Sequence, residues 1–113
     1  MNRVLSGLRA WVVQRMSAVY LALFVIYVAL HTLLAPPGDY GAWRQWIGEP
    51  GMLLAVSLAY VALLLHAWVG IRDVVLDYIH PFILRLFVLF AIALFLVGCG
   101  LWAGLVLLKV VLV

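Results

Sequence analysis

Residues 51–71 read GMLLAVSLAYVALLLHAWVGI and contain no Asp, Glu, Lys or Arg. Residues 16–34 and 86–108 are equally free of these charged side chains. Each stretch is close to the roughly 20 residues that a helix needs to cross the hydrocarbon core of a bilayer. We therefore predict an all-α fold with three transmembrane helices, at about residues 12–35, 51–78 and 82–112.

The composition of the whole chain agrees with this prediction. Of its 113 residues, 70% are hydrophobic and 10% are charged, and the mean hydropathy is +1.29. Soluble domains are roughly 45–50% apolar, so an ordinary soluble domain is excluded. We expect a single integral membrane domain over residues 1–113 with no separate soluble catalytic module, so any enzyme activity would be shared with other chains.

Proline and aromatic residues mark the connections between the predicted helices. The first connection is APPGDYGAWRQWIGEPG, in which Pro36 and Pro37 stop one helix and Pro50 starts the next. We expect Tyr40, Trp43 and Trp46 within it to form an aromatic belt at the outer membrane surface. The second connection is short, and Pro81 suits the first turn of the third helix.

Basic residues predict the orientation. Seven Lys and Arg against four Asp and Glu give a net charge of +3. Most of the basic residues fall on one side of the predicted membrane, namely Arg3, Arg9, Arg15, Arg72 and Arg85, whereas Arg44 and Lys109 fall on the other. Because cytoplasmic loops are enriched in Lys and Arg, we place the N-terminus in the cytoplasm and the C-terminus outside. A membrane protein with this pattern implies no nucleic-acid partner.

His66 is the most informative polar residue, because polar groups in hydrocarbon are costly and usually functional. On a helical wheel its stripe holds Ala59, Ala62 and Gly70 on one part and Asp73 and Asp77 on another. Small neighbours would let a flat haem lie close to the helix while the imidazole binds its iron. Alternatively, the imidazole hydrogen-bonds another helix and the small residues serve close packing. The spacing leaves both interpretations open.

The three histidines cannot all serve one iron. Counted at about 1.5 Å per residue from the cytoplasmic edge, His31 lies roughly 24 Å deep and His66 about 9 Å deep. Two axial nitrogens of one haem are only about 4 Å apart, so a second ligand would come from another polypeptide. We expect His31 at the outer interface or in a helix contact, and His80 in solvent.

A cluster of polar residues is expected at the cytoplasmic boundary, formed by Arg15, Arg72, Asp73, Asp77 and Tyr78. A phenol at this depth can hydrogen-bond the carbonyl of a membrane quinone, and carboxylates can relay protons. The competing interpretation is an ordinary interfacial tyrosine beside solvated charges. In the third helix, Gly100 and Gly104 form a GxxxG motif that permits close approach to a neighbour, and Cys99 is expected to be a small packed side chain.

The run from His66 to Pro81, HAWVGIRDVVLDYIHP, resembles the H-A-W-x-G and D-Y-x-x-P segment of the bacterial succinate dehydrogenase hydrophobic membrane anchor subunits. The run Arg15-Met16-Ser17-Ala18 and the three-span plan extend this resemblance over nearly the whole chain. The resemblance implies that His66 is an axial ligand to haem b, with a histidine of the cytochrome b556 subunit as the other ligand.

The same resemblance implies roles for three more residues. Tyr78 matches the tyrosine that hydrogen-bonds ubiquinone, Asp77 matches the adjacent acid of the quinone pocket, and Arg15 matches an arginine near the haem propionates. This chain departs from its relatives at Arg72, Asp73 and His80. These departures put the charge of the quinone pocket in doubt, but they leave the haem ligand unaffected.

The resemblance further implies a place in respiratory complex II, succinate:ubiquinone oxidoreductase, in the bacterial inner membrane. The expected partners are the cytochrome b556, iron–sulfur and flavoprotein subunits, in a heterotetramer whose trimerisation stays open. The chain itself would not oxidise succinate but would contribute to reduction of ubiquinone. Two alternatives are kept: a fumarate reductase-type anchor, and a small transporter or structural membrane protein.

Overall fold

The computed structural model describes the backbone of residues 2–112 and the side chains of residues 7–112. The described chain is entirely helical, with α1 (Asn2–Leu34), α2 (Tyr40–Ile47), α3 (Pro50–Tyr78) and α4 (Phe82–Leu112). Three segments are long and apolar enough to cross a membrane, namely Gly7–Leu34, Pro50–Tyr78 and Phe82–Leu112. The prediction of an all-α fold with three membrane-spanning helices is therefore confirmed.

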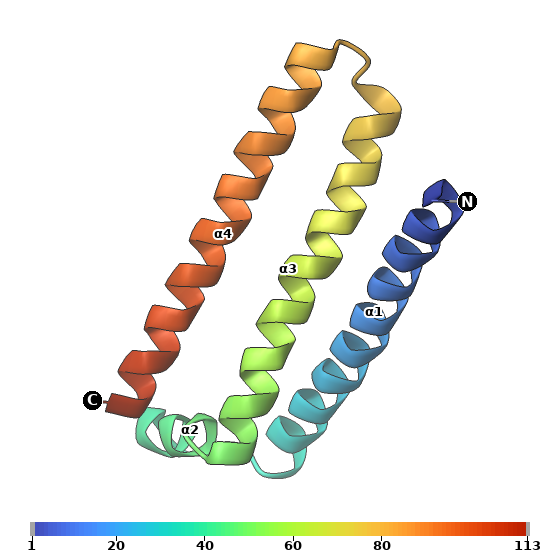
Figure 1. Cartoon of the computed structure of the whole chain (residues 1–113). Coiled ribbons are helices and arrows are strands. Elements are labelled where there is room, and N and C mark those ends of the chain that lie inside the picture. The colour runs from blue at the N-terminus through green and yellow to red at the C-terminus, as the bar shows by residue number, and fades with distance from the viewer. Residues whose placement is uncertain (1, 113) are drawn as a thin grey trace.

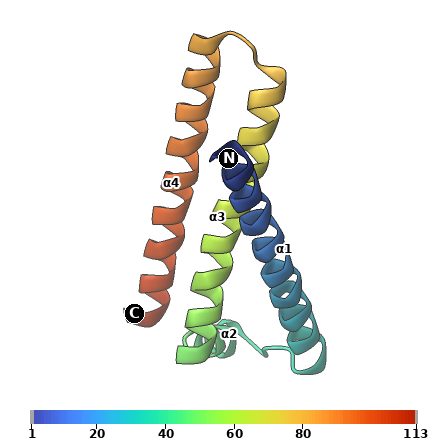
Figure 2. The ribbon, with the colours of Figure 1, turned by 45° about the vertical axis from the view of Figure 1, so that its right-hand side comes forward.

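The three long helices run side by side, with α3 in the middle (Figure 1). Helix α1 packs on one side of α3 and α4 packs on the other, and the turned view in Figure 2 keeps this order. The N-terminal end of α1 lies toward the α3–α4 connection, whereas α2 and the C-terminus lie at the opposite end. The bundle is elongated, with extents of 52 × 25 × 21 Å.

Helix α1 begins at Asn2, about ten residues before the start that we expected from the apolar run. The expected start marks where the uncharged stretch begins, and the helix itself begins earlier. Residues 2–15 hold no proline and contain three arginines, two leucines and three valines, so nothing in them stops a helix. The helix therefore continues through Arg9 and Arg15.

Helix α2 was missed by the sequence analysis, which treated this region as a connection. The Asp39 carboxylate caps its start by accepting a hydrogen bond from the Ala42 backbone N–H at 2.8 Å. Ile47 is buried while Tyr40 is exposed, and the helix lies across one end of the bundle (Figure 1). Arg44 Nε donates to the Val110 carbonyl at 3.2 Å, which ties α2 to the end of α4.

The connection between α3 and α4 is short and firmly held. Proline at the first position begins α3, as expected, and its last residue is Tyr78. Beyond it, Arg85 of α4 donates from Nε to the Ile79 carbonyl at 2.9 Å and from Nη2 to the Leu76 carbonyl at 3.2 Å. A cationic side chain thus satisfies carbonyls at the C-terminal end of α3, where the helix dipole also favours positive charge.

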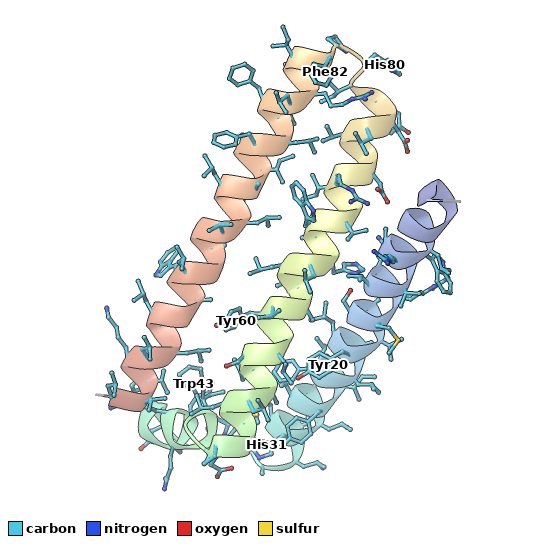
Figure 3. All side chains as sticks on the ribbon, in the orientation of Figure 1. Tyr20, His31, Trp43, Tyr60, His80 and Phe82 are labelled. Carbon is cyan, nitrogen blue, oxygen red and sulfur yellow. The ribbon has the colours of Figure 1, made fainter. Side chains whose placement is uncertain are left out.

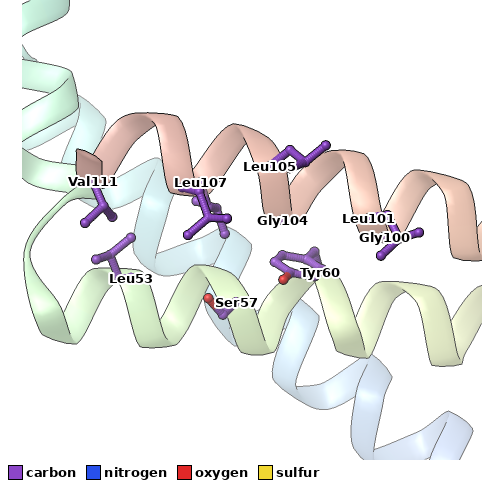
Figure 4. A pocket seen from close by; sticks show the side chains of 10 residues that line it. Leu53, Ser57, Tyr60, Gly100, Leu101, Gly104, Leu105, Leu107 and Val111 are labelled. Carbon is purple, nitrogen blue, oxygen red and sulfur yellow. The ribbon is translucent and has the colours of Figure 1, made fainter. Parts of the chain in front are cut away.

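The GxxxG motif of α4 faces α3 of the same chain. A Cβ atom built on Gly100 would lie 2.8 Å from Leu64 Cδ1, and one built on Gly104 would lie 3.7 Å from Tyr60 Oη. Figure 4 shows Tyr60 directed toward α4 in this region. The small residues therefore bring α4 close to α3, as small residues do between membrane helices.

Candidate functional site

His66 lies on the face of α3 that packs against α1. Its Nδ1 atom is 3.2 Å from Ser17 Oγ and 3.3 Å from the carbonyl oxygen of Gln14, both of α1. Ser17 is the one buried polar residue in the described part of the chain, with 7% of its surface exposed. Further along the same contact between α1 and α3, the Tyr20 hydroxyl donates to the Ala55 carbonyl at 2.7 Å. These bonds fix the α1–α3 contact around the imidazole, and Figure 3 shows Tyr20 between the two helices.

The hydrogen-bond pattern assigns the proton on the imidazole. The Ser17 hydroxyl has one proton, and it donates this proton to the Gln14 carbonyl at 3.0 Å. The proton between Ser17 and His66 must therefore come from Nδ1, and the Gln14 carbonyl can only accept. Both contacts place a hydrogen on Nδ1, so a neutral His66 carries its free lone pair on Nε2. None of the described residues hydrogen-bonds to Nε2.

A pocket of about 260 Å³ opens beside this imidazole, lined by Trp11, Gln14, Arg15, Ala18 and His66. The Arg15 guanidinium lies over the Trp11 ring, 5.5 Å from its centroid. An imidazole, a cation and an aromatic ring thus line one pocket. Such a set suits a flat group that carries both a metal and acidic substituents.

The small-residue stripe of α3 faces α1. Ala59 is buried, and a Cβ atom on Gly70 would lie 3.6 Å from Gln14 Nε2, which is ordinary van der Waals contact. The sequence left two roles open for Gly70, namely room for a flat macrocycle and close packing between helices. Its neighbour is the side chain of Gln14, so the space is used for helix packing at this position.

Arg15 does not join the boundary cluster in which the sequence analysis placed it. Gln14 and Ser17 bracket His66, so Arg15 lies at the level of the imidazole. At about 1.5 Å per residue, this level is roughly 9 Å deeper than Arg72. The expectation used the edge of the apolar run as the membrane edge, but a long arginine side chain is tolerated further along a helix.

Tyr78 and Asp77 lie in the last turn of α3, and both are exposed, Tyr78 by 78%. Counting along the helix, Tyr78 is about 18 Å from His66. In the same region, Arg72 Nη2 is 3.5 Å from Asp73 Oδ1. Asp77, Tyr78, Arg72 and Asp73 therefore share one end of α3, without the Arg15 that we had expected beside them.

The other histidines lie away from the pocket. His31 stacks on Trp46 of α2, with ring centroids 4.0 Å apart and an interplanar angle of 6°. It is about 21 Å along α1 from the Ser17 level, and His80 is exposed in the opposite connection. Figure 3 shows His31 and His80 at opposite ends of the bundle. Within the described residues, no three His, Cys, Asp or Glu side chains gather as a metal site.

A cavity of about 690 Å³ lies between α3 and α4 (Figure 4). It is lined by leucines, Val111, Gly100 and Gly104, and its only side-chain polar groups are the hydroxyls of Ser57 and Tyr60. No histidine, cysteine, carboxylate or basic side chain lines this groove, so it offers no set of metal ligands. The candidate site is therefore the smaller pocket at His66.

Gln14 and Ser17 are the site residues that the sequence analysis missed. From the sequence, Ser17 was recognised only as part of the run Arg15-Met16-Ser17-Ala18, without a role of its own. Their spacing of three residues places them on one face of α1, and a polar pair on one face of a spanning helix is itself a signal. Which residue of α3 they contact depends on how α1 and α3 are aligned, and the sequence leaves that alignment open.

Comparison with known proteins gives a consistent result. Residues 3–100 match the family described as succinate dehydrogenase/fumarate reductase transmembrane subunit. The chain is 29% identical over 97 residues to the succinate dehydrogenase hydrophobic membrane anchor subunit of Coxiella burnetii, covering 86% of this chain and 84% of that protein. The protein of the same description from Rickettsia conorii is 31% identical over 91 residues, covering 80% and 72%. That from Rickettsia felis is 30% identical over 101 residues, covering 82% and 84%.

Three spanning helices, with an imidazole held between two of them, define a small multi-pass membrane subunit. The chain belongs to the succinate dehydrogenase/fumarate reductase transmembrane subunit family, among the succinate dehydrogenase hydrophobic membrane anchor subunits. The resemblance seen in the sequence is thereby confirmed. Membership of this family displaces the alternative of an unrelated small transporter or structural protein.

Proposed function

We propose that this chain anchors succinate dehydrogenase in the bacterial inner membrane, supplies one axial ligand to a haem b, and helps to bind ubiquinone. The observation that carries the proposal is the hydrogen bonding of His66, which occupies Nδ1 and leaves Nε2 without a partner, on an imidazole that lines a pocket together with Arg15. A haem bound there would carry one electron at a time between iron states.

The residues of the pocket fit this group. An iron ligand needs an imidazole with one unprotonated nitrogen, and the contacts to α1 engage Nδ1, so that Nε2 is the nitrogen left for the iron. Arg15 would offset the negative charge of the propionates with its guanidinium. Ala18 leaves room in the lining of the pocket. One imidazole supplies only one axial bond, so the second ligand is assigned to the cytochrome b556 subunit.

The end of α3 is the proposed contribution to the quinone site. The Tyr78 hydroxyl donates a hydrogen bond to a quinone carbonyl, and the Asp77 carboxylate beside it lies where it can pass protons inward from water. Both side chains are exposed, so a quinone headgroup and a partner subunit can reach them. The isoprenoid tail of the quinone would remain in lipid along the apolar faces of the bundle.

Family membership supports the proposed partners, and the distribution of basic residues supports the proposed orientation. We place the chain with the flavoprotein, iron–sulfur and cytochrome b556 subunits in a heterotetramer that passes electrons from succinate to ubiquinone. The N-terminus and the α3–α4 connection are placed on the cytoplasmic side, and the C-terminus on the periplasmic side. This orientation puts Arg72, Arg85 and the quinone residues on the side that faces the peripheral subunits.

Replacing Tyr78 with phenylalanine is expected to lower ubiquinone reduction about tenfold, because one hydrogen bond worth about 1.4 kcal/mol is lost. The haem spectrum and subunit content should stay unchanged, since the ring remains and its hydroxyl bonds to none of the described residues. The measurement is succinate-dependent reduction of ubiquinone by the purified complex, beside reduction of a water-soluble acceptor that takes electrons from the peripheral subunits.

Tyr40→Phe is the matched control, because Tyr40 is also an exposed phenol but lies in α2 at the other end of the bundle. It should retain full activity with both acceptors. Unchanged ubiquinone reduction in the Tyr78 variant would reject the role of the hydroxyl. Equal losses with both acceptors would also reject it, because they would indicate failed attachment of the peripheral subunits.

A further inference from the structure

We propose that Ser17 is a positioning residue for the haem, acting through His66. The inference rests on the proposed haem function and assigns a part of it to a residue of α1. Ser17 Oγ accepts a hydrogen bond from His66 Nδ1–H at 3.2 Å, and its own hydroxyl donates one to the Gln14 carbonyl at 3.0 Å. The result is a chain of two hydrogen bonds that begins at the imidazole and ends on the backbone.

The hydroxyl is the principal acceptor for the imidazole proton. The Gln14 carbonyl lies 3.3 Å from Nδ1, but it also accepts the Ser17 hydroxyl and takes part in the hydrogen-bond ladder of α1. A carbonyl oxygen has only two lone pairs, so little of its capacity remains for His66. The Ser17 oxygen has no such competition in the described structure.

Burial gives this bond its effect. Only 7% of the Ser17 surface is exposed, so water cannot replace the hydroxyl, and a hydrogen bond in a low-dielectric interior is electrostatically stronger than one in water. Two acceptors on one helix also fix the plane of the imidazole ring. Ser17 thereby selects the tautomer with a free Nε2 and fixes the orientation in which that nitrogen would bind the haem iron.

This arrangement makes two measurable properties depend on Ser17. An acceptor at Nδ1–H draws the proton away from the ring and makes Nε2 a stronger electron donor, which favours ferric iron. Losing the acceptor should therefore raise the reduction potential of the haem. Metal sites that lose such an outer partner typically lose 10–100-fold in affinity, and we expect the lower end because the Gln14 carbonyl remains.

The test compares Ser17→Val with Ser17→Thr in the purified complex. The two side chains have the same shape and differ in the hydroxyl, so their difference isolates the hydrogen bond. One measurement is a potentiometric titration of the haem absorption band, and the other is the rate of haem transfer to excess apomyoglobin. We expect Ser17→Thr to match the parent complex, whereas Ser17→Val shows a higher potential and haem loss about ten times faster.

Ser17→Ala removes the hydroxyl without adding volume at this buried position. If Ser17→Val fails to assemble, the alanine variant takes its place, with the same expected shifts relative to Ser17→Thr. Equal potentials and equal rates of haem loss with and without the hydroxyl would overturn the role of Ser17. A parent complex without haem would instead refute the proposed function, so the two failures are distinguishable.

Discussion

A complex that carries His66→Ala is expected to lose its haem b absorption band. Alanine removes the only imidazole in the pocket at the α1–α3 contact, and no other described residue there offers a nitrogen lone pair. The proposed bond from His66 to the haem iron is then lost, and the partner subunit's ligand alone would hold the haem more weakly. The measurement is the reduced-minus-oxidised spectrum of the purified complex, normalised to its flavin content.

His31→Ala and His80→Ala are the matched controls. His31 stacks on Trp46 at the α2 end, and His80 is exposed in the α3–α4 connection, so neither lies in the pocket. Both control variants should keep the haem band. Persistence of the band in the His66 variant, or its loss only with His31 or His80, would show that the ligand has been misassigned.

The second large effect is expected for Gly100→Leu, through the packing of α4 on α3. Even the first side-chain atom at this position would lie 2.8 Å from Leu64 Cδ1, and a leucine adds three further carbons. The Leu64 side chain must move aside to admit the leucine, and overpacking of this kind costs about 1–3 kcal/mol when side chains take strained rotamers or the backbone shifts. We expect a lower unfolding temperature for the detergent-purified complex and less of it in the membrane.

Gly98→Leu provides the comparison, because no atom lies within 4 Å of a Cβ built there. Both changes replace a glycine of the same helix with the same residue, so they share any gain in helix propensity and hydrophobicity. Gly98→Leu should therefore unfold at or above the temperature of the parent complex. Equal unfolding temperatures for the two variants would contradict the close α3–α4 contact.

The spanning helices were predictable because their signals are local. Uncharged runs of suitable length located them, and prolines marked the start of α3 and the approach to α4 closely. Helix α2 escaped prediction because eight residues with aromatic and charged side chains carry no membrane signal. Its Asp39 cap is a local signal for a helix start that was not used.

The alignment of helices explains what was missed at the site. His66 stood out as a polar residue in hydrocarbon, which is a property of α3 alone. Its contacts with Ser17 and Gln14 depend on the axial offset between α1 and α3. Packing between the two helices sets this offset. The same offset separates Arg15 from Asp77 and Tyr78, which the edges of the apolar runs had placed together.

The proposed ligation also bears on assembly. A haem ligated by one histidine from each anchor would bind the associated pair more tightly than either chain alone, so its binding free energy would add to the stability of their association. The hydrogen bonds from His66 to α1 would contribute indirectly by fixing the orientation of the imidazole before the two chains associate. The chain alone would then bind haem more weakly than the assembled pair does.

The most direct measurement is to purify the tagged chain from native membranes, identify the proteins that accompany it, and record the electron paramagnetic resonance spectrum of its oxidised haem. We expect a flavoprotein, an iron–sulfur protein and a second membrane subunit, with a low-spin haem ligated by two imidazoles. We also expect that the haem is released when the two membrane subunits are separated. A chain that keeps six-coordinate haem by itself, or an intact four-subunit complex that contains none, would contradict this expectation.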